Sequence, residues 1–408
     1  MRAELSRCHS ARSVQTVKRL QGKRHGCPAI GVRPAAYDRC MDADLPLSAL
    51  LSQAFVAYVI EFDNKFEHQV PHRTTKFGST PGYVRPPWLV SMAMWLRFMR
   101  WVPIEGIAAR ELQAQIAISS KGLQTWLTRL SKWWGYLAIE EPDAKSRSGR
   151  IGPEATVRPT VGGRRAIEVW RTLIPTVERR WRDRFGKEAL AALEEGLRAV
   201  AGRLDPGAPA YFSILEYEDK KSRAARMQLP ARELELPELL AMVLVAFAGE
   251  FEGKSTASLA VCANVLRVTP DGGVRVRDLP RLACLAEMGV GDALRQLGRQ
   301  HLGIVATETT GGRAKILRLT PRGRLAREAY IPRTAEIERD WKKRFGQGTM
   351  ERLRTALEEM VLGRNGGPSP LLRGVTPYAD GWRAKLPPLE GLPHFPMVSH
   401  RGGFPDGS

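Results

Sequence analysis

The sequence predicts a mainly α-helical fold with small β-hairpins, of the α+β class, built from two similar units in tandem. Apolar residues recur at helical spacing along most of the chain. Residues 160–186 and 320–346 also align without a gap, each block preceded by a strand–loop–strand pattern and followed by a helical segment with spaced leucines. A duplication of this size indicates two domains of one fold, so each copy can be used to check the other.

The duplication extends beyond these two blocks. Within them, identical residues are Thr160/Thr320, Gly163/Gly323, Arg164/Arg324, Ala166/Ala326, Glu168/Glu328, Glu178/Glu338, Arg179/Arg339, Trp181/Trp341, Arg184/Arg344, Phe185/Phe345 and Gly186/Gly346. Further upstream, Glu61 matches Glu250 at an offset of 189, and Arg110 matches Arg277 at an offset of 167. The falling offset places insertions in the loops of the first copy.

The repeat and the composition together divide the chain into five segments. Residues 45–203 form the first unit and residues 232–363 the second, joined by a linker over 204–231 that holds Pro, Gly and a charged run. Residues 1–44 are a basic segment without sustained periodicity, either a disordered arm that touches DNA backbone or upstream sequence from a wrongly assigned start codon. Residues 364–408 are too rich in Pro and Gly for long helices and are expected to dock in extended form.

Charge and hydropathy limit the functional classes. A net charge of +20 favours a polyanionic partner, with nucleic acid first, although arginines spread over solvated faces would give the same value. No apolar run reaches the roughly 18–20 residues of a membrane span, and the N-terminal segment lacks the apolar core of a signal peptide. We therefore expect a cytoplasmic protein with no membrane partner.

The first unit contains a pair of helices joined by a short turn. After an N-terminal helix that starts near Leu45, residues 107–116 show helical spacing, and Ser119 is a good N-cap for the next helix. That next helix turns Leu123, Trp126, Leu127 and Leu130 to one face. Its other face carries long polar and basic side chains, which suits the major groove of DNA.

A basic hairpin follows this helix pair. Residues 134–139 and 156–158 read as strands on either side of a loop that carries Lys145, Arg147 and Arg150. In the second copy, residues 303–305 and 315–319 flank a shorter loop with Arg313. A helix-turn-helix followed by a β-hairpin is the winged-helix arrangement, so we expect two tandem winged helix-turn-helix domains.

Long closing helices are expected after each hairpin. Residues 178–184 read ERRWRDR and residues 338–344 read ERDWKKR, with aromatic residues at helical spacing. Gly186 and Gly346 are placed to end these helices. The aromatic face is expected to pack into a core or a dimer seam, and a ligand pocket between domains is the alternative.

The order of these elements, found twice, resembles MarR-type winged-helix regulators. The resemblance is carried by the run from Gly312 through Leu319 to Arg324, and by Thr160 through Arg164. It covers residues 45–203 and 232–363. It implies DNA binding, transcriptional control and a small-molecule effector. It also implies that the terminal helices pair the two copies as an intramolecular pseudo-dimer, or pair two chains as a homodimer.

We therefore expect a transcriptional regulator that binds double-stranded DNA, with no enzymatic activity and no cofactor. The residues expected to contact DNA are Ser120, Lys121, Gln124, Thr125, Arg129, Lys132, Lys145, Arg147, Arg150, Arg313 and Lys315. The alternative hypothesis is a winged-helix protein of the same fold that does not bind DNA and acts as a module for protein interaction or small-molecule sensing. No metal-ligand spacing or catalytic triad stands out in the sequence.

The two copies are not expected to contribute equally. Window 119–129 of the first unit carries net charge +2, whereas the matched window 286–296 carries −1. Lys121 is matched by Met288 and Thr125 by Asp292. Acidic groups that face phosphate weaken binding, so the first copy should be the main reader and the second its partner in the pseudo-dimer.

Overall fold

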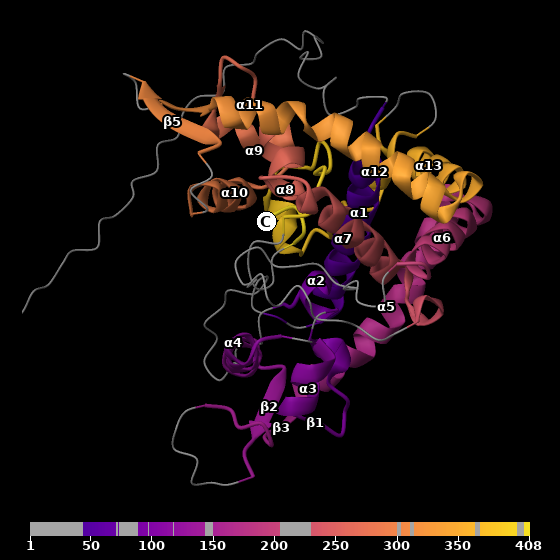
Figure 1. The fold of residues 1–408 in the computed structure, drawn as a ribbon. Coiled ribbons are helices and arrows are strands. Elements are labelled where there is room, and N and C mark those ends of the chain that lie inside the picture. Colours follow the sequence, from indigo (N-terminus) through magenta and orange to yellow (C-terminus); the bar gives the residue numbers. More distant parts are fainter. Residues whose placement is uncertain are drawn as a thin grey trace, which may run out of the picture.

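A computed structural model describes most of the chain. The residues described are 44–70, 72, 89–96, 98–116, 118–142, 150–204, 230–299, 303–310, 314–363, 368–397 and 404–408. Outside these ranges lie residues 1–43 of the basic segment 1–44, residues 205–229 of the linker, and Lys145, Arg147 and Arg313. The fold is mainly helical with two small antiparallel sheets, as the sequence predicts (Figure 1).

The first unit begins with a long helix and ends with two more. Its elements are α1 (Leu47–Gln69), α2 (Met92–Trp95), η2 (Met99–Trp101), β1 (Ile107–Ala108), α3 (Ala109–Ile116), α4 (Ser120–Lys132), β2 (Leu137–Glu140), β3 (Thr156–Pro159), α5 (Val161–Phe185) and α6 (Lys187–Ala201). One part of the prediction for residues 107–116 is wrong. Ile107 and Ala108 are a strand and not the start of a helix, because they pair with Val157 and Thr156.

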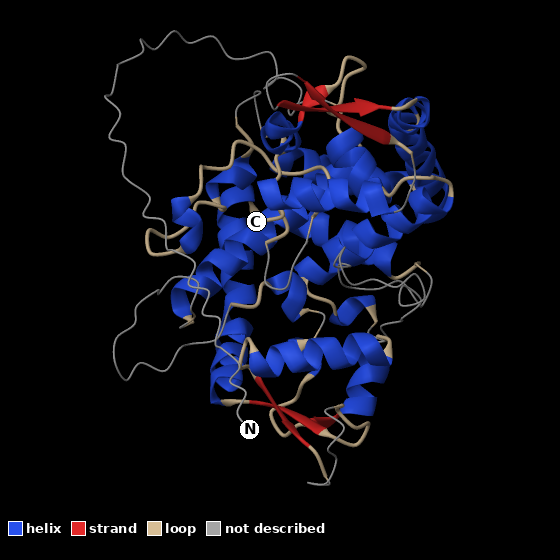
Figure 2. Ribbon diagram, turned by 90° about the vertical axis from the view of Figure 1, so that its left-hand side faces the viewer, coloured by secondary structure: helices blue, strands red, loops and turns tan. Residues whose placement is uncertain are grey.

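The second unit repeats this order, except that a 3-10 turn precedes its third helix and two helices stand in place of α5. After η4 (Ala231–Glu233) its elements are α7 (Leu236–Gly253), α8 (Leu259–Val261), the π-helical turn η5 (Cys262–Leu266), β4 (Val274–Arg275), η6 (Val276–Asp278), α9 (Leu279–Ala283), α10 (Glu287–Arg299), β5 (Val305–Thr310), β6 (Ala314–Leu319), α11 (Pro321–Glu328), α12 (Tyr330–Phe345) and α13 (Gln347–Val361). The strand orders are β1-β3-β2 and β4-β6-β5, which is the same topology twice. The two sheets lie at opposite ends of the molecule, with helices between them (Figure 2).

The residues that the two copies share perform the same local tasks. Thr160 caps α5 by accepting a hydrogen bond from the Gly163 amide at 3.0 Å, and Thr320 caps α11 through Gly323 at 3.2 Å. A Cβ atom on Gly163 or on Gly323 would lie 2.1 Å from a backbone carbonyl oxygen at the start of the hairpin. Only glycine allows this close approach of helix and strand, which explains its repetition.

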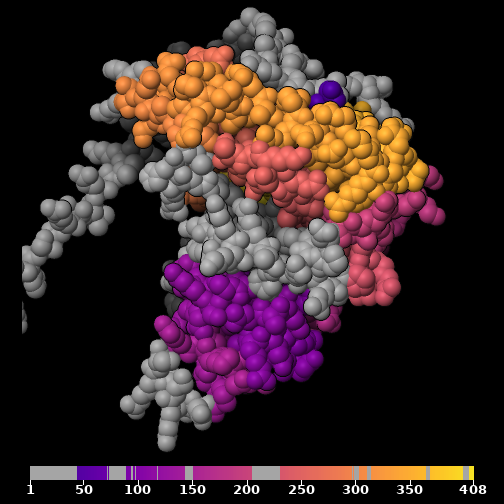
Figure 3. All heavy atoms as spheres, viewed as in Figure 1, coloured from indigo at the N-terminus to yellow at the C-terminus, as the bar shows by residue number. Residues whose placement is uncertain are grey.

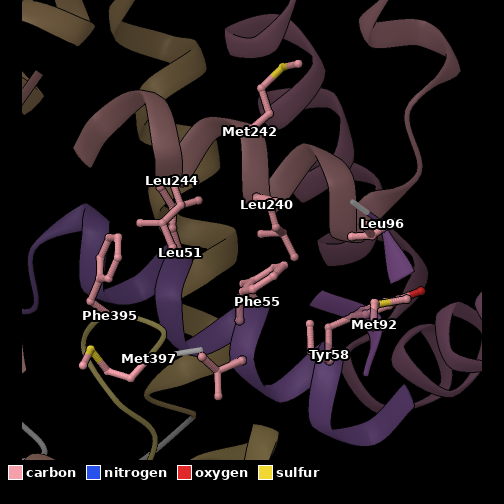
Figure 4. Close-up of a cluster of buried hydrophobic side chains, with 14 of the residues drawn as sticks. Leu51, Phe55, Tyr58, Met92, Leu96, Leu240, Met242, Leu244, Phe395 and Met397 are labelled. Atoms are coloured by element: carbon pink, nitrogen blue, oxygen red, sulfur yellow. The ribbon is translucent and has the colours of Figure 1, made fainter. Parts of the chain in front are cut away.

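The hydrophobic core is centred on the first helix of each unit. Helices α1 and α7 pack against each other and are buried on nearly all sides. The contacts are reciprocal, since α1 packs against α13, α7 packs against α6, and α6 packs against α13. Figure 4 shows side chains of α1, α7 and the C-terminal segment meeting in one cluster. The aromatic faces of the closing helices are buried in this core, with Trp181 and Trp341 each about 1 % exposed or less.

The C-terminal segment, defined here as residues 368–397 and 404–408, lies across both units. Its short helical turns are η7 (Pro370–Arg373) and η8 (Trp382–Lys385). Asn64 of α1 donates a hydrogen bond to the Val375 carbonyl at 3.0 Å, and Asn264 of η5 donates one to the Phe395 carbonyl at 2.8 Å. Because it contacts α1 and η5, the segment joins the two units.

Stability should depend on pH through Glu67, which holds the C-terminal segment. Its carboxylate accepts a hydrogen bond from the Trp382 amide at 3.0 Å, and burial raises its pKa from 4.5 to about 7. Because the folded-state pKa is the higher one, the contribution of Glu67 to stability is greatest below pH 4.5, falls as pH rises to 7, and is constant above that. Glu67→Gln should therefore stabilise the chain by about 2–3 kcal/mol at pH 8 and by little at pH 4.5.

Urea unfolding at the two pH values would measure this difference. The other charged groups around Glu67 are Asp63, Asp380, Arg383 and Lys385, and His72 lies beside it. All of them stay in the variant, although it also removes the Glu67 charge that helps to raise the pKa of Asp63. The exposed Glu111→Gln is the matched control and should not shift stability at either pH. An equal gain for Glu67→Gln at both pH values would contradict the assignment to its ionisation.

Candidate nucleic-acid interface

The turn between α3 and α4 is held by side-chain hydrogen bonds. Ser119 caps α4 by accepting from the Gly122 amide at 3.1 Å, as the sequence predicts. Gln113 of α3 donates to the Ile118 carbonyl and to the Ser120 hydroxyl, both at 3.1 Å. These bonds fix the angle at which α4 leaves the turn, so its outer face has a defined direction.

Helix α4 has an apolar inner face and a polar outer face. Leu123, Trp126, Leu127 and Leu130 are buried, as expected from their spacing. On the outer side Ser120, Lys121 and Lys132 are exposed, whereas Gln124, Thr125 and Arg129 are half-buried. The exposed cations can therefore reach an anionic partner without rearrangement of the helix.

Gln124 connects α4 to the hairpin. Its side-chain oxygen accepts from the Ile151 amide at 2.9 Å, and its amide nitrogen donates to the Ile151 carbonyl. Both polar groups of this side chain are thus engaged by backbone on the far side of the β2–β3 loop. The prediction that Gln124 reads bases therefore competes with a positioning role, in which it sets the distance between helix and wing.

The remaining predicted residues of the first unit have different surroundings. Thr125 donates to the Lys121 carbonyl within the helix at 2.9 Å. The Arg129 guanidinium lies over the Trp133 ring at 5.6 Å, and Trp133 is 47 % exposed. Arg150 is exposed at the edge of the hairpin loop. Lys121, Lys132 and Arg150 are thus the predicted cations with exposed side chains in the described part of the first unit.

The matched region of the second unit has a different surface. Glu287 and Met288 are exposed at the start of α10, and Arg295 is paired with Asp292 on the same helix. Gly291 stands where the first unit has Gln124, and a cavity of about 480 Å³ opens there between α10, α9 and β6. Lys315 is exposed beside this cavity. Among the described side chains, α10 therefore presents fewer exposed cations than α4, although Arg275, Arg277 and Lys315 line the cavity beside it. At position 291 glycine offers no side chain that could tie α10 to the hairpin.

Sequence reasoning did not find a cavity of about 510 Å³ beside α5. It is lined by Trp95, Leu96, Met99, Arg100, Trp101, Val102, Pro103, Ile104, Ile107, Gln115, Ile167, Trp170, Arg171, Ile174 and Glu235. Arg100 forms an ion pair with Glu238 of α7, and burial raises the pKa of Glu235. The cavity therefore has aromatic walls, charged groups of both signs, and contributions from both units.

Comparison with protein-family models, with curated proteins and with solved structures found no match to this chain. Among the described residues, none of the helices combines the length and the apolar character that a bilayer crossing requires. The same part of the chain holds no group of three or more His, Cys, Asp or Glu side chains placed to bind a metal ion. The first unit forms the lower part of the face shown in Figure 3, with α11, α12 and α13 above it.

Proposed function

We propose that this chain is a transcriptional regulator that binds double-stranded DNA through tandem winged helix-turn-helix units of the MarR type. The observation that carries the proposal is α4, whose exposed Lys121 and Lys132 project from a helix fixed by Ser119 and Gln113. The repeated order of strand, helix, turn, helix and hairpin supports it. The net charge of +20 supplies long-range attraction to the duplex. Such a protein would act in the cytoplasm.

The first unit is proposed as the main reader and the second as its partner in an intramolecular pseudo-dimer. The reciprocal packing of α1 with α13 and of α7 with α6 supports this pairing. Close approach at the seam also supports it, because a Cβ atom on Gly196 of α6 would lie 2.9 Å from the Leu353 Cβ atom of α13. Association of two chains into a homodimer would add a second pair of units, and light scattering of the full chain separates the two cases.

Salt dependence tests the proposal. If about six phosphates are contacted, affinity for a duplex should fall roughly a thousandfold between 50 and 200 mM salt. Fluorescence anisotropy with a labelled duplex at several salt concentrations measures the slope. The same duplex with excess unlabelled competitor separates specific from general retention. Absence of retention at 50 mM salt, or retention that does not change with salt, would refute DNA binding.

A second candidate function, small-molecule sensing, is favoured by the cavity beside α5. Trp95, Trp101 and Trp170 suit a planar apolar ligand, and Arg171 suits an anionic substituent. We propose an aromatic carboxylate as the ligand class, tested by quenching of tryptophan fluorescence with salicylate or benzoate. Arg171→Ala should weaken the quenching at least severalfold, and Arg179→Ala, an exposed arginine outside the cavity lining, should not. Equal quenching of all three proteins would argue against the site.

A further inference from the structure

The end of the C-terminal segment lies along the first turn of α10. The Ala286 amide, just before α10, donates a hydrogen bond to the Asp406 carbonyl at 2.9 Å. A Cβ atom on Gly289 would lie 3.0 Å from the Gly407 Cα atom, so the two backbones are in direct contact. Gly407 has a φ of +82°, a conformation that glycine adopts readily. The contact therefore depends on glycine on both sides, Gly289 in α10 and Gly407 in the C-terminal segment.

Buried interactions hold this end of the segment in place. Arg383 and Asp406 form an ion pair at 2.8 Å and are only 5 % and 2 % exposed. The Arg383 guanidinium also lies over the Phe404 ring at 4.6 Å, and Phe404 is 1 % exposed. A backbone hydrogen bond joins the two stretches of the segment, 368–397 and 404–408, because the Met397 amide donates to the Pro405 carbonyl at 2.7 Å. This end of the segment is thus firmly packed against the second unit.

This contact would widen the first turn of α10 on one flank, while Glu287, Met288 and Arg295 stay exposed on its outer face. A groove about 12 Å wide admits one helix, and a helix with its side chains is already about 10–12 Å across. A second backbone in contact with the flank of α10 adds to that width at the end of the helix that would enter first. On α4 the matched glycine, Gly122, has its nearest neighbours in Ile118 and Ser119 of its own turn. Among the described residues, the nearest atoms on this flank of α4 belong to its own turn.

Charge acts in the same direction as the steric contact. Glu287 is exposed at the first position of α10, where α4 has Ser120. Arg295, the one cation in the matched window, is already paired with Asp292. A carboxylate at the entering end of a helix repels phosphate, so α10 would be disfavoured in the groove even if it could fit.

We infer, on the basis of the proposed function, that the chain recognises a single non-palindromic half-site and not an inverted repeat. The first unit supplies all base readout through α4 and its wing. The second unit fixes the first through the helical core and touches at most the DNA backbone. The ligand is therefore a duplex with one uninterrupted block of sequence preference.

Selection from random duplexes with the full-length chain tests this inference at about 150 mM salt. We expect one asymmetric block of preferred bases. Two blocks in inverted orientation, about 10 base pairs apart, selected by a chain that light scattering shows to be monomeric, would overturn the inference and leave the proposed function intact. Absence of any enrichment, together with absence of retention at 50 mM salt, would instead refute the proposed function. The two failures are thus distinguishable.

A pair of glycine variants tests the steric step. Gly289→Val should unseat the segment, because its side chain meets the Gly407 backbone, whereas Gly291→Val in the same helix faces open space. Hydrogen exchange at the Ala286 amide reports release, and a hydroxyl-radical footprint reports DNA coverage. We expect faster exchange for Gly289→Val and not for Gly291→Val, and a longer footprint on the second unit's side once Glu287→Gln is added to Gly289→Val. Faster exchange with an unchanged footprint in that double variant would overturn the steric step.

Discussion

Replacing Glu61 by alanine is expected to destabilise the fold by about 3–5 kcal/mol, because the change leaves a largely covered cation and a buried indole without their partner. Glu61 is 1 % exposed and accepts two hydrogen bonds from the Arg184 guanidinium, at 3.0 and 3.1 Å. It also accepts one from the Trp181 indole at 3.1 Å. Without the carboxylate, the buried Trp181 indole and the Arg184 guanidinium, which is 14 % exposed, lose their acceptor.

The duplication provides a matched control for this prediction. Glu250 occupies the equivalent position and pairs with Arg344 at 3.3 Å, but the two side chains are 37 % and 42 % exposed. An exposed pair of this kind contributes about 0–1 kcal/mol, so Glu250→Ala should have little effect. Urea unfolding followed by far-ultraviolet circular dichroism would measure both variants. Equal losses of stability would show that burial of the first pair is not what makes it strong.

The C-terminal segment causes the difference between these two ion pairs. A Cβ atom on Gly374 would lie 2.1 Å from a Glu61 carboxylate oxygen, so the segment passes directly over the first pair. Burial of a charged pair increases the cost of breaking it, since the remaining charge is held away from water. The same two residues thus contribute differently in the two copies because a third element covers only one of them.

Much of the fold could be predicted because local interactions repeat within the chain. The caps at Thr160 and Thr320, the helix ends at Gly186 and Gly346, and the spacing of apolar residues in α4 all act over a few residues. Such interactions are encoded in short sequence windows. The second copy then shows which residues of a window the fold requires. Gly163 and its match Gly323 are an example, because each allows the same close approach to a backbone carbonyl oxygen.

Other features depend on partners that are distant in sequence. The two-residue strands β1 and β4 are too short to show alternation, and they form because β3 and β6 lie beside them. The path of the C-terminal segment follows from pairs such as Ser52 with the Pro393 carbonyl, 341 residues apart. Periodicity indicates which face of an element is buried but does not identify what buries it.

The candidate site likewise combines features that short sequence windows encode with features that depend on distant residues. Sequence patterning identified the polar face of α4, and Lys121 and Lys132 are exposed there. It could not show that Gln124 bonds to Ile151, or that Gly291 leaves a cavity in the matched place, because both depend on the fold of the hairpin. The charge difference between α4 and α10 was visible in the sequence, but the segment that flanks α10 was not.

Lys121→Ala is expected to weaken duplex binding about 5- to 100-fold, equivalent to about 1–3 kcal/mol. Lys121 is exposed one residue inside the start of α4, at the end of the helix that would enter the groove in the proposed complex. Loss of its ammonium group would then remove either a base contact or a phosphate contact. Anisotropy titrations at constant salt measure the change in affinity.

Two variants in α10 serve as controls for this prediction. Met288→Ala changes the matched position, and Arg295→Ala removes a cation that is already paired with Asp292, so each should alter affinity less than about twofold. A Lys121→Ala loss of affinity no larger than that of Arg295→Ala would contradict the assignment of readout to the first unit.

The salt dependence of binding then separates a phosphate contact of Lys121 from a base contact. If Lys121 contacts phosphate, the slope of log affinity against log salt should fall by about one, and if it contacts a base, the preferred sequence should relax at one position.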